Sequence, residues 1–408
     1  MSRTPLALVL AALIAPVAAA QEEEPVRELA AAHANFACDL YRTLASPSSD
    51  DIFFSPHSIS AALEMTWAGA RGDTAAEMAR ALSIGALGDR VHGANGALAA
   101  ELARRERPAD PEQGGEPFRL RVSNALWGQA GYEFRPDFLE LLSSRYGAVL
   151  RILDFQADTE AARKTINAEI SKATEEKIPE LLLPPDVTRD VRLVLTNAIY
   201  FKASWNEPFR EAATENGPFT LLDGSKVEVP IMRRTDWYPS FQEDGFQAIE
   251  IPYVGEEIAM TIFVPAAGKL GEFERGLTGE RLSGLLARLA DEGHQVALGL
   301  PRFEVRSRFA LKDALLALGM KKAFVFGEAD FSGMNGNHEL YVGGVIHEAF
   351  VKVDEKGTEA AAATAVMMRA GGVPPRPIAL TIDRPFVYLV RDRGTGAVLF
   401  MGRVVDPR

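Results

Sequence analysis

The sequence has a single cysteine, Cys38, so the chain can form no internal disulfide. Its stability must come from a packed core, for which a hydrophobic content of 47% is ordinary. Basic residues are also in deficit, because 44 Lys and Arg stand against 56 Asp and Glu, a formal net charge of −12. Such a chain repels phosphate backbones, so nucleic acid is not expected as a partner.

The sequence motifs of common enzymes are missing as well. There is no Gly-x-Ser-x-Gly elbow, no P-loop and no dinucleotide fingerprint. His347 and Glu348 are not followed by the second histidine that a zinc-protease helix needs four residues after the first. We therefore expect a protein that is not an enzyme and that needs neither a metal nor another cofactor.

Long hydrophobic runs are absent too, apart from one at the start of the chain. Arg3 is basic, Leu6–Val17 is apolar, and Ala18–Ala20 offers a small-residue cleavage site, which together predict a signal peptide at 1–20. About a dozen apolar residues are too few to cross ~30 Å of hydrocarbon. We expect the mature chain, 21–408, to be secreted into an extracellular or periplasmic space without a membrane anchor.

Hydrophobic periodicity indicates an α+β fold in one uninterrupted chain, with helices early and strands later. Helices are expected over 33–44, 58–70 with Ser58 as a candidate cap, 134–147, 159–173 and 309–320. Strands are expected over 118–128, 191–202, 227–233, 246–264, 295–306 and most of 340–405.

The segment Val353–Pro375, VDEKGTEAAAATAVMMRAGGVPP, carries the functional signal and allows two readings. Its alanines favour a helix by propensity alone. Its charges favour a strand, because Glu359 and Arg369 both fall on odd positions and the even positions from Thr358 carry none. One face of that strand could be buried without trapping a charge, which would cost several kcal/mol.

Several motifs, in family order and over nearly the whole mature chain, resemble those of the serpins, the serine protease inhibitor family. The residues 355–361 (EKGTEAA) look like the hinge of the inhibitory type. The motifs 53–60 (FFSPHSIS), 197–202 (NAIYFK), 330–334 (DFSGM), 383–386 (DRPF) and 398–407 (VLFMGRVVDP) match other recurring family segments. Each match is weak alone, and together they are specific. The chain is thus similar to an inhibitory, bacterial-like secreted serpin.

This resemblance implies a serpin fold: one domain over 21–408, with helices packed around three β-sheets and an exposed reactive-centre loop at about 355–375. It implies a monomer that acts as a suicide substrate. A target protease cuts the loop and forms an acyl-enzyme, and the cut loop inserts into the central sheet. Loop insertion in serpins is a known switching device.

The resemblance also assigns roles to individual residues. It implies a hinge, a polar cluster under the sheet called the shutter, and a site called the breach at the top of the sheet. The hinge comprises Glu355, Gly357, Thr358, Glu359, Ala360, Ala361, Ala362 and Ala363; the shutter, Ser55, Ser58, Asn197 and His347; the breach, Trp205 and Glu355, with Arg302 as candidate partner.

Counting along the loop by family length puts the reactive bond at Gly371-Gly372. Glycine before the cut leaves a protease pocket unfilled. An elastase-like or subtilisin-like protease that prefers small residues is therefore the first expectation. A trypsin-like protease that cuts between Arg369 and Ala370 is the second, and a cysteine protease is a further class of target.

Two other readings stay open at this point. A non-inhibitory serpin that acts as a carrier, storage protein or chaperone is one, although such members tend to have charged, proline-bearing or bulky hinges. The hinge here, Thr358–Thr364, has no proline and one charge, at Glu359. A hydrolase is the other, and the missing motifs speak against it.

Overall fold

Fifteen strands form in the part of the chain that the structure describes. This computed structural model describes residues 8–46, 48–106, 119–358 and 377–408, and gives the backbone alone for 8–23, 121–123 and 200. The strands are β1 (Ile52–Phe54), β2 (Arg119–Gln129), β3 (Leu150–Leu153), β4 (Leu193–Ser204), β5 (Glu215–Thr220), β6 (Lys226–Glu243), β7 (Phe246–Pro252), β8 (Ile258–Pro265), β9 (Gly293–Pro301), β10 (Phe303–Ala310), β11 (Gly344–Asp354), β12 (Gly357–Thr358), β13 (Ile378–Thr381), β14 (Phe386–Asp392) and β15 (Val398–Val404).

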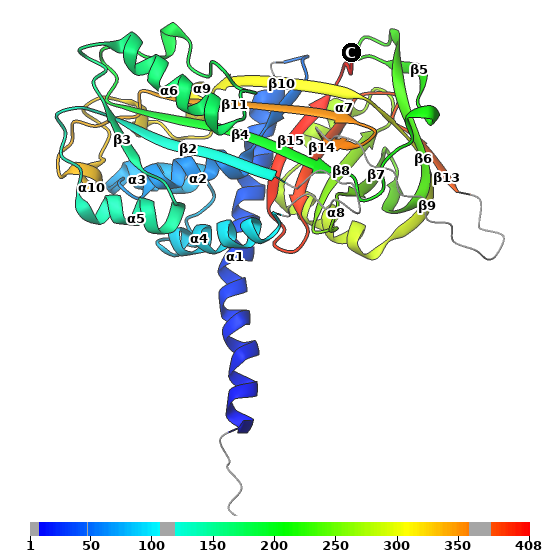
Figure 1. Cartoon of the computed structure of the whole chain (residues 1–408), viewed down its shortest axis with the longest axis horizontal. Coiled ribbons are helices and arrows are strands. Elements are labelled where there is room, and N and C mark those ends of the chain that lie inside the picture. Colours follow the sequence, from blue (N-terminus) through cyan, green and yellow to red (C-terminus); the bar gives the residue numbers. More distant parts are fainter. Residues whose placement is uncertain (1–7, 47, 107–118, 359–376) are drawn as a thin grey trace, which may run out of the picture.

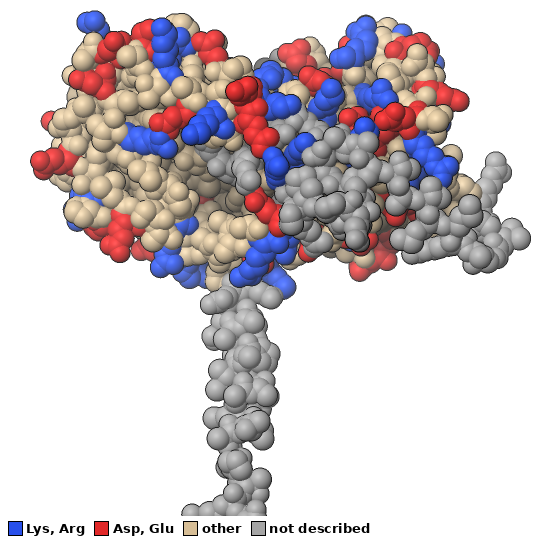
Figure 2. Space-filling view, viewed as in Figure 1, with Lys and Arg blue, Asp and Glu red and all other residues tan. Residues whose placement is uncertain are grey.

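Helices surround these strands (Figure 1). They are α1 (Leu8–Ala45), α2 (Pro56–Trp67), α3 (Gly72–Ala81), α4 (Arg90–Arg104), α5 (Pro136–Tyr146), α6 (Thr159–Ala173), α7 (Leu270–Arg275), α8 (Gly279–Asp291), α9 (Lys312–Ala317) and α10 (Ser332–Asn335), with short 3-10 turns η1 (Pro184–Asp186), η2 (Glu211–Ala213) and η3 (Lys322–Phe324). Both signs of charge are interspersed over the face seen in Figure 2, so the acidic excess does not form a single patch there.

The strands form three sheets, two of which share β6. The central sheet has the order β10-β11-β12-β4-β2-β3. The N-terminal part of β6 pairs with β5 and β9, and its last residues, Ser240–Glu243, pair with β7. The sheet that begins there continues through β8, β14 and β15 to β1. The long strand β6 therefore belongs to two sheets, whereas the sequence predicted a shorter strand over 227–233.

Alternating residues give the central sheet two buried faces. Along β4, Leu195 and Ile199 point into the main core, which α1, α2 and the other sheets complete. Val194 and Ala198 point the other way, into a smaller cluster that Ile166 of α6 covers. A strand buried on both faces reads as a nearly continuous apolar run, which is how β4 looks in the sequence.

The start of α2 differs from the predicted one in a way that matters for the site. Ser55 is the N-cap, because its hydroxyl accepts a hydrogen bond from the Ser58 N–H at 3.2 Å, and Pro56 occupies the first turn. Ser58 is therefore not the cap that periodicity suggested. It lies inside the helix, and its side chain is free to bond to the sheet.

Other boundaries show where pattern reading succeeds and fails. The helices predicted over 134–147 and 159–173 are confirmed as α5 and α6, whereas α9 is shorter than the predicted 309–320. Helix α8 was missed, although its leucines, which include Leu282, Leu285 and Leu289, recur at helical spacing on one buried face.

The backbone of α1 begins at Leu8 and is continuous past Ala20, the predicted cleavage point. Among the residues whose side chains the structure describes, no helix has both the length and the apolar character needed to cross a membrane. The C-terminal half of α1 is a core element, with Leu29, Phe36 and Leu40 fully buried.

Candidate functional site

The short strand β12 lies between β11 and β4 at one end of the central sheet. Thr358 pairs with Val353 of β11 on one side and with Ala203 of β4 on the other, and both pairings are antiparallel. Further along, β11 and β4 pair directly with each other in parallel, Gly344–Ala349 against Val194–Ile199. The sheet is therefore already parted at one end by the first residues of the predicted hinge.

This arrangement moves the start of the exposed loop. The sequence placed the loop at about 355–375, but Glu355 is 3% exposed and Thr358 is completely buried. The physical reason is the double pairing of β12, which satisfies its backbone on both sides and draws the hinge into the sheet. The first part of the predicted loop is thus a component of the folded core.

Gly357 is required by the close approach of β4. Its φ is +152°, which L-residues with a side chain rarely adopt. A Cβ at this position would stand 2.1 Å from the carbonyl oxygen of Ala203 and 2.7 Å from the Cα of Ser204. Only glycine lets the chain turn from β11 into β12 without pushing β4 away.

Two stacked aromatic side chains, Tyr253 and Trp205, hydrogen-bond to the residues that form and flank β12. The Tyr253 hydroxyl lies 2.8 Å from the Thr358 hydroxyl, and the Tyr253 ring stacks on Trp205 with centroids 4.5 Å apart. The Trp205 indole Nε1 donates to the carbonyl of Asp354 at 2.9 Å, and its backbone N–H donates to the carbonyl of Lys356 at 2.9 Å. Trp205 therefore does more than fill the core, because it holds both ends of the turn into β12.

An ion pair closes the top of the sheet. The Arg302 Nε lies 2.9 Å from both carboxylate oxygens of Glu355, and Nη2 lies 2.5 Å from Oε1. Thr214 donates a further hydrogen bond to the same carboxylate. Burial alone would raise the pKa of Glu355, but these bonds outweigh it and lower the pKa. The structure thus brings together the two residues that the sequence singled out as candidate partners.

A row of polar side chains crosses the central sheet beneath the hinge. Asn124 of β2, Asn197 of β4 and His347 of β11 are directly opposite one another in the strand register. The Asn197 Nδ2 donates to the Asn124 Oδ1 at 2.5 Å and to the Ser58 Oγ at 2.5 Å. The Ser58 hydroxyl donates to Asn124 at 2.9 Å. With Ser55, these residues form what we call the shutter cluster.

His347 is the buried centre of the shutter cluster. Its Nε2 accepts the backbone N–H of Ser55 at 3.1 Å, so the ring proton must be on Nδ1, which donates to the Asn197 Oδ1 at 2.5 Å. Burial lowers the pKa of His347 to about 3, so the ring is neutral at physiological pH. The Ser55 hydroxyl donates to the carbonyl of Leu399, at 2.6 Å, and so ties the cluster to β15.

Asn124 is the one member of the shutter cluster that sequence reasoning missed. It stands in the strand 118–128, where Val122 and Leu126, two positions away on the same face, are apolar; an asparagine between them on that face is unusual, and this was the available signal. Its role depends on which residue of β4 lies opposite, and strand register between distant segments cannot be read from either segment alone.

Several predicted site residues lie outside the residues that the structure describes. They are the later hinge residues Glu359, Ala360, Ala361, Ala362 and Ala363, the bond Gly371-Gly372, and the alternative bond Arg369-Ala370. Within the described ranges, no group of three or more His, Cys, Asp or Glu side chains could hold a metal ion.

Comparisons with known proteins agree with this geometry. The family model described as serpin (serine protease inhibitor) matches residues 31–407. The human leukocyte elastase inhibitor is 35% identical over 94% of this chain and all of its own length. An uncharacterized serpin-like protein of Thermococcus kodakarensis is 38% identical over 92% of this chain and 84% of its own. The structure of human thyroxine-binding globulin matches with a TM-score of 0.81 at 27% identity, over 94% of this chain and 99% of that one.

The chain has the architecture of a single domain in which helices pack around a central sheet and two further sheets. It belongs to the serpin family, with the serpin fold in one domain. The family model is described as serine protease inhibitor and the human relative is named an inhibitor, so the chain is classed with protease inhibitors and not with enzymes.

Proposed function

We propose that this serpin inhibits serine-type endopeptidases as a suicide substrate, by inserting its cleaved loop between β11 and β4. The observation that carries the proposal is β12, which already occupies the first step of that insertion with antiparallel pairing on both sides. A loop that enters a sheet only after cleavage needs a starting point from which strand pairing can spread, and Gly357–Thr358 provides one.

The register of β12 determines where each later residue would go. Continuing from Thr358, residues 359–361 would fill the stretch where β11 and β4 have no direct pairing. Residues 362–367 would then replace the six direct pairs of β11 with β4. Thr364 would arrive between His347 and Asn197, in the middle of the shutter cluster.

The same register supports the parity seen in the sequence. Thr358 points into the core, where it meets Tyr253, so the even positions that follow would also face inward. Those positions carry Ala, Thr, Val and Met up to Ala370, and none carries a charge. Glu359 and Arg369 would face outward. Insertion would also exchange a parallel pairing for two antiparallel ones, which are slightly more stable per residue.

The target is inferred from the predicted cut. Cleavage at Gly371-Gly372 favours a protease that accepts small residues, elastase-like or subtilisin-like, and similarity to a leukocyte elastase inhibitor supports this choice. A trypsin-like protease that cuts after Arg369 is the second candidate, and a cysteine protease is a further class. We further propose that the chain is a secreted monomer, exported by the signal peptide at 1–20 into an extracellular or periplasmic space.

A non-inhibitory role is the alternative, because human thyroxine-binding globulin, whose structure was solved as a complex with thyroxine, has the same fold. The hinge composition argues against a carrier, storage or chaperone role for this chain. Between Thr358 and Thr364 it has no proline and no large side chain on the inward face.

The test is to mix residues 21–408 with elastase, subtilisin and trypsin and to separate the products by denaturing electrophoresis. We expect a covalent complex with at least one protease. Mass analysis should show that the released C-terminal peptide begins at Gly372, or at Ala370 for trypsin. Turnover of the chain by all three, without any covalent species, would contradict the proposal.

A matched pair of variants separates insertion from cleavage. Ala362→Pro removes a backbone donor from the strand to be inserted, so we expect it to be cut at the same bond but to form little or no complex. Ala362→Ser keeps the donor and the small size, and we expect it to inhibit like the parent. Equal complex formation by Ala362→Pro would exclude insertion through this segment.

A further inference from the structure

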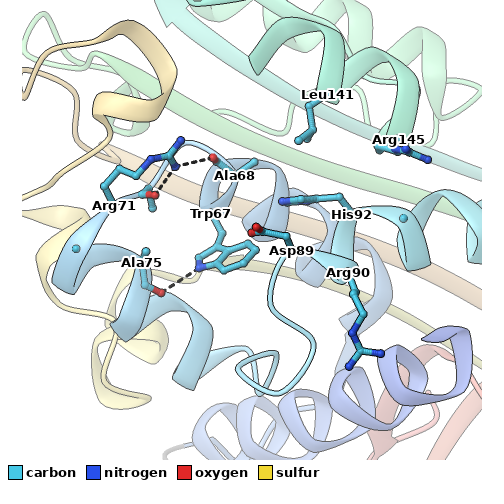
Figure 3. Close-up of a pocket in the computed structure, with 12 residues that line it drawn as sticks. Trp67, Ala68, Arg71, Ala75, Asp89, Arg90, His92, Leu141 and Arg145 are labelled. Atoms are coloured by element: carbon cyan, nitrogen blue, oxygen red, sulfur yellow. Dashed lines mark hydrogen bonds between the residues drawn. The ribbon is translucent and has the colours of Figure 1, made fainter. Parts of the chain in front are cut away.

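A pocket lies among the helices, on parts of the chain that the inhibitory mechanism does not use. Its volume is about 840 Å³, and it opens between the end of α2, the start of α3, the start of α4 and the helix α5 (Figure 3). The lining residues that matter here are Trp67, Arg71, Asp89, His92, Leu141 and Arg145. We call it the α2–α5 pocket.

The lining is basic in a protein of net charge −12, because it holds three arginines and a single acid. Arg90 is paired with Glu28 at 2.9 Å and points away from the centre of the pocket in Figure 3. Arg71 donates from Nη1 to the carbonyls of Ala68 and Ala70, at 3.0 and 2.6 Å, which leaves its other donors uncommitted. The Arg145 side chain makes no hydrogen bond or ion pair with any residue that the structure describes.

Arg71 is also held in place by its surroundings. A Cβ on Gly333 would stand 2.5 Å from the Arg71 guanidinium carbon, so the guanidinium lies flat against the glycine backbone. The position of this cation is therefore built into the fold. Asp330 lies close enough to Arg71 that the guanidinium helps to lower the pKa of its carboxyl, so Arg145 is the cation of the lining without an acid partner among the described residues.

His92 presents one ring nitrogen to the pocket. Its side chain is 8% exposed, and its Nδ1 lies 2.7 Å from the Tyr146 hydroxyl. When that hydroxyl donates to Nδ1, the ring proton of the neutral imidazole is on Nε2. Within the described part of the chain Nε2 has no partner, and Figure 3 shows the imidazole directed into the pocket. Nε2 is therefore a donor that a ligand in the pocket could accept from.

Apolar groups occupy the remaining walls. The Trp67 indole nitrogen is already satisfied by the carbonyl of Ala75 at 3.0 Å, so the ring offers an apolar surface. Leu141 projects from α5 on the opposite side of the pocket in Figure 3. An aromatic face, an aliphatic side chain and a few convergent donors are the usual components of a small-molecule site.

We propose that the α2–α5 pocket binds a small aromatic anion, with its ring between Trp67 and Leu141 and its carboxylate or phosphate facing Arg145 and the His92 Nε2. Guanidinium groups are well suited to such anions, because their planar donors can bind two oxygens at once. Asp89, the acid in the lining, opposes the anion and weakens its binding.

The experiment is titration calorimetry of residues 21–408 with phenyl phosphate, inorganic phosphate and benzyl alcohol at pH 7.5. We expect saturable binding of phenyl phosphate at millimolar or lower concentration, with weaker binding of the two fragments. Arg145→Gln removes a charged donor that makes no internal bond, and binding should fall about tenfold or more. Asp89→Asn should strengthen binding by a few-fold.

The control is Arg104→Gln, an exposed arginine paired with Glu101 outside the pocket, which should bind like the parent. Unchanged melting temperatures for Arg145→Gln and Asp89→Asn would show that the fold is intact. Absence of saturable binding, or equal affinity of the parent and Arg145→Gln, would overturn the proposal. Inorganic phosphate that binds as tightly as phenyl phosphate would refute the part played by Trp67 and Leu141.

Discussion

Cutting the loop should make this protein more resistant to heat, which is the reverse of what a nick does to an ordinary domain. The perturbation is cleavage at Gly371-Gly372, or by trypsin at Arg369-Ala370, without any other change. By the proposed mechanism, residues 359–370 would then continue the strand that β12 begins, between β11 and β4.

The expected size of the effect comes from the residues that insertion would bury. The ladder bonds gained on both sides, at about 1 kcal/mol each, roughly offset the 1–2 kcal/mol per residue needed to order the strand. The surplus is apolar burial: by the register, Val366 and Met368 would face inward, at about 1.5–3 kcal/mol each. The gain is thus about 3–6 kcal/mol.

For a chain of this length the entropy of unfolding is about 0.8 kcal/mol/K, so the melting temperature should rise by about 4–8 °C or more. Scanning calorimetry of the intact and the nicked protein, with the cut verified by mass spectrometry, measures this directly. Nicked Ala362→Pro should gain little. An unchanged or lower melting temperature for the nicked parent would refute the idea that the loop enters the sheet.

Three further predictions concern the described residues. Gly357→Ala should destabilise the fold by about 2 kcal/mol or more, because the added Cβ would clash with β4. Gly224→Ala is the control, because Gly224 also has a positive φ but has open space around it, and it should cost about 1 kcal/mol. Equal losses of stability in denaturant titrations would argue against the close approach of β4 to Gly357. Glu355→Gln should lower the free energy of unfolding by about 1 kcal/mol at pH 7, since the arginine partner of Glu355 is 44% exposed. Because the folded-state pKa of Glu355 is lowered, the difference in unfolding free energy between parent and variant should be full at neutral pH and shrink as the pH falls below about 4. A difference that does not change with pH would contradict the ion pair. Burial lowers the folded-state pKa values of His57 and His347 to about 3, so as the pH falls these histidines are protonated in the unfolded chain first. The free energy of unfolding should therefore fall by about 1 kcal/mol per histidine for each pH unit from about 6.5 downward. His57→Leu should reduce that slope, and an unchanged slope would exclude a contribution from His57.

The sequence predicted most of the site because its chemistry is carried by local motifs. The motif at 197–202, the segment around Glu355 and the candidate partner Arg302 can all be identified in the sequence alone. The structure places the last two in contact and puts Asn197 beside His347. The restriction of charged residues in the loop to odd positions can likewise be read from the sequence, because side chains alternate between the two faces of a strand.

What the sequence alone determined about this protein is its family, its α+β architecture and the chemical types of its site residues, because motifs and periodicity are properties of contiguous segments. Tertiary structure alone decided that Asn124 joins the shutter cluster, that Gly357 and Thr358 already lie between β11 and β4, and that His92 faces a basic pocket. Each of these depends on the register or packing of segments far apart in the chain, and a shift of one residue in a strand would turn every side chain to its other face.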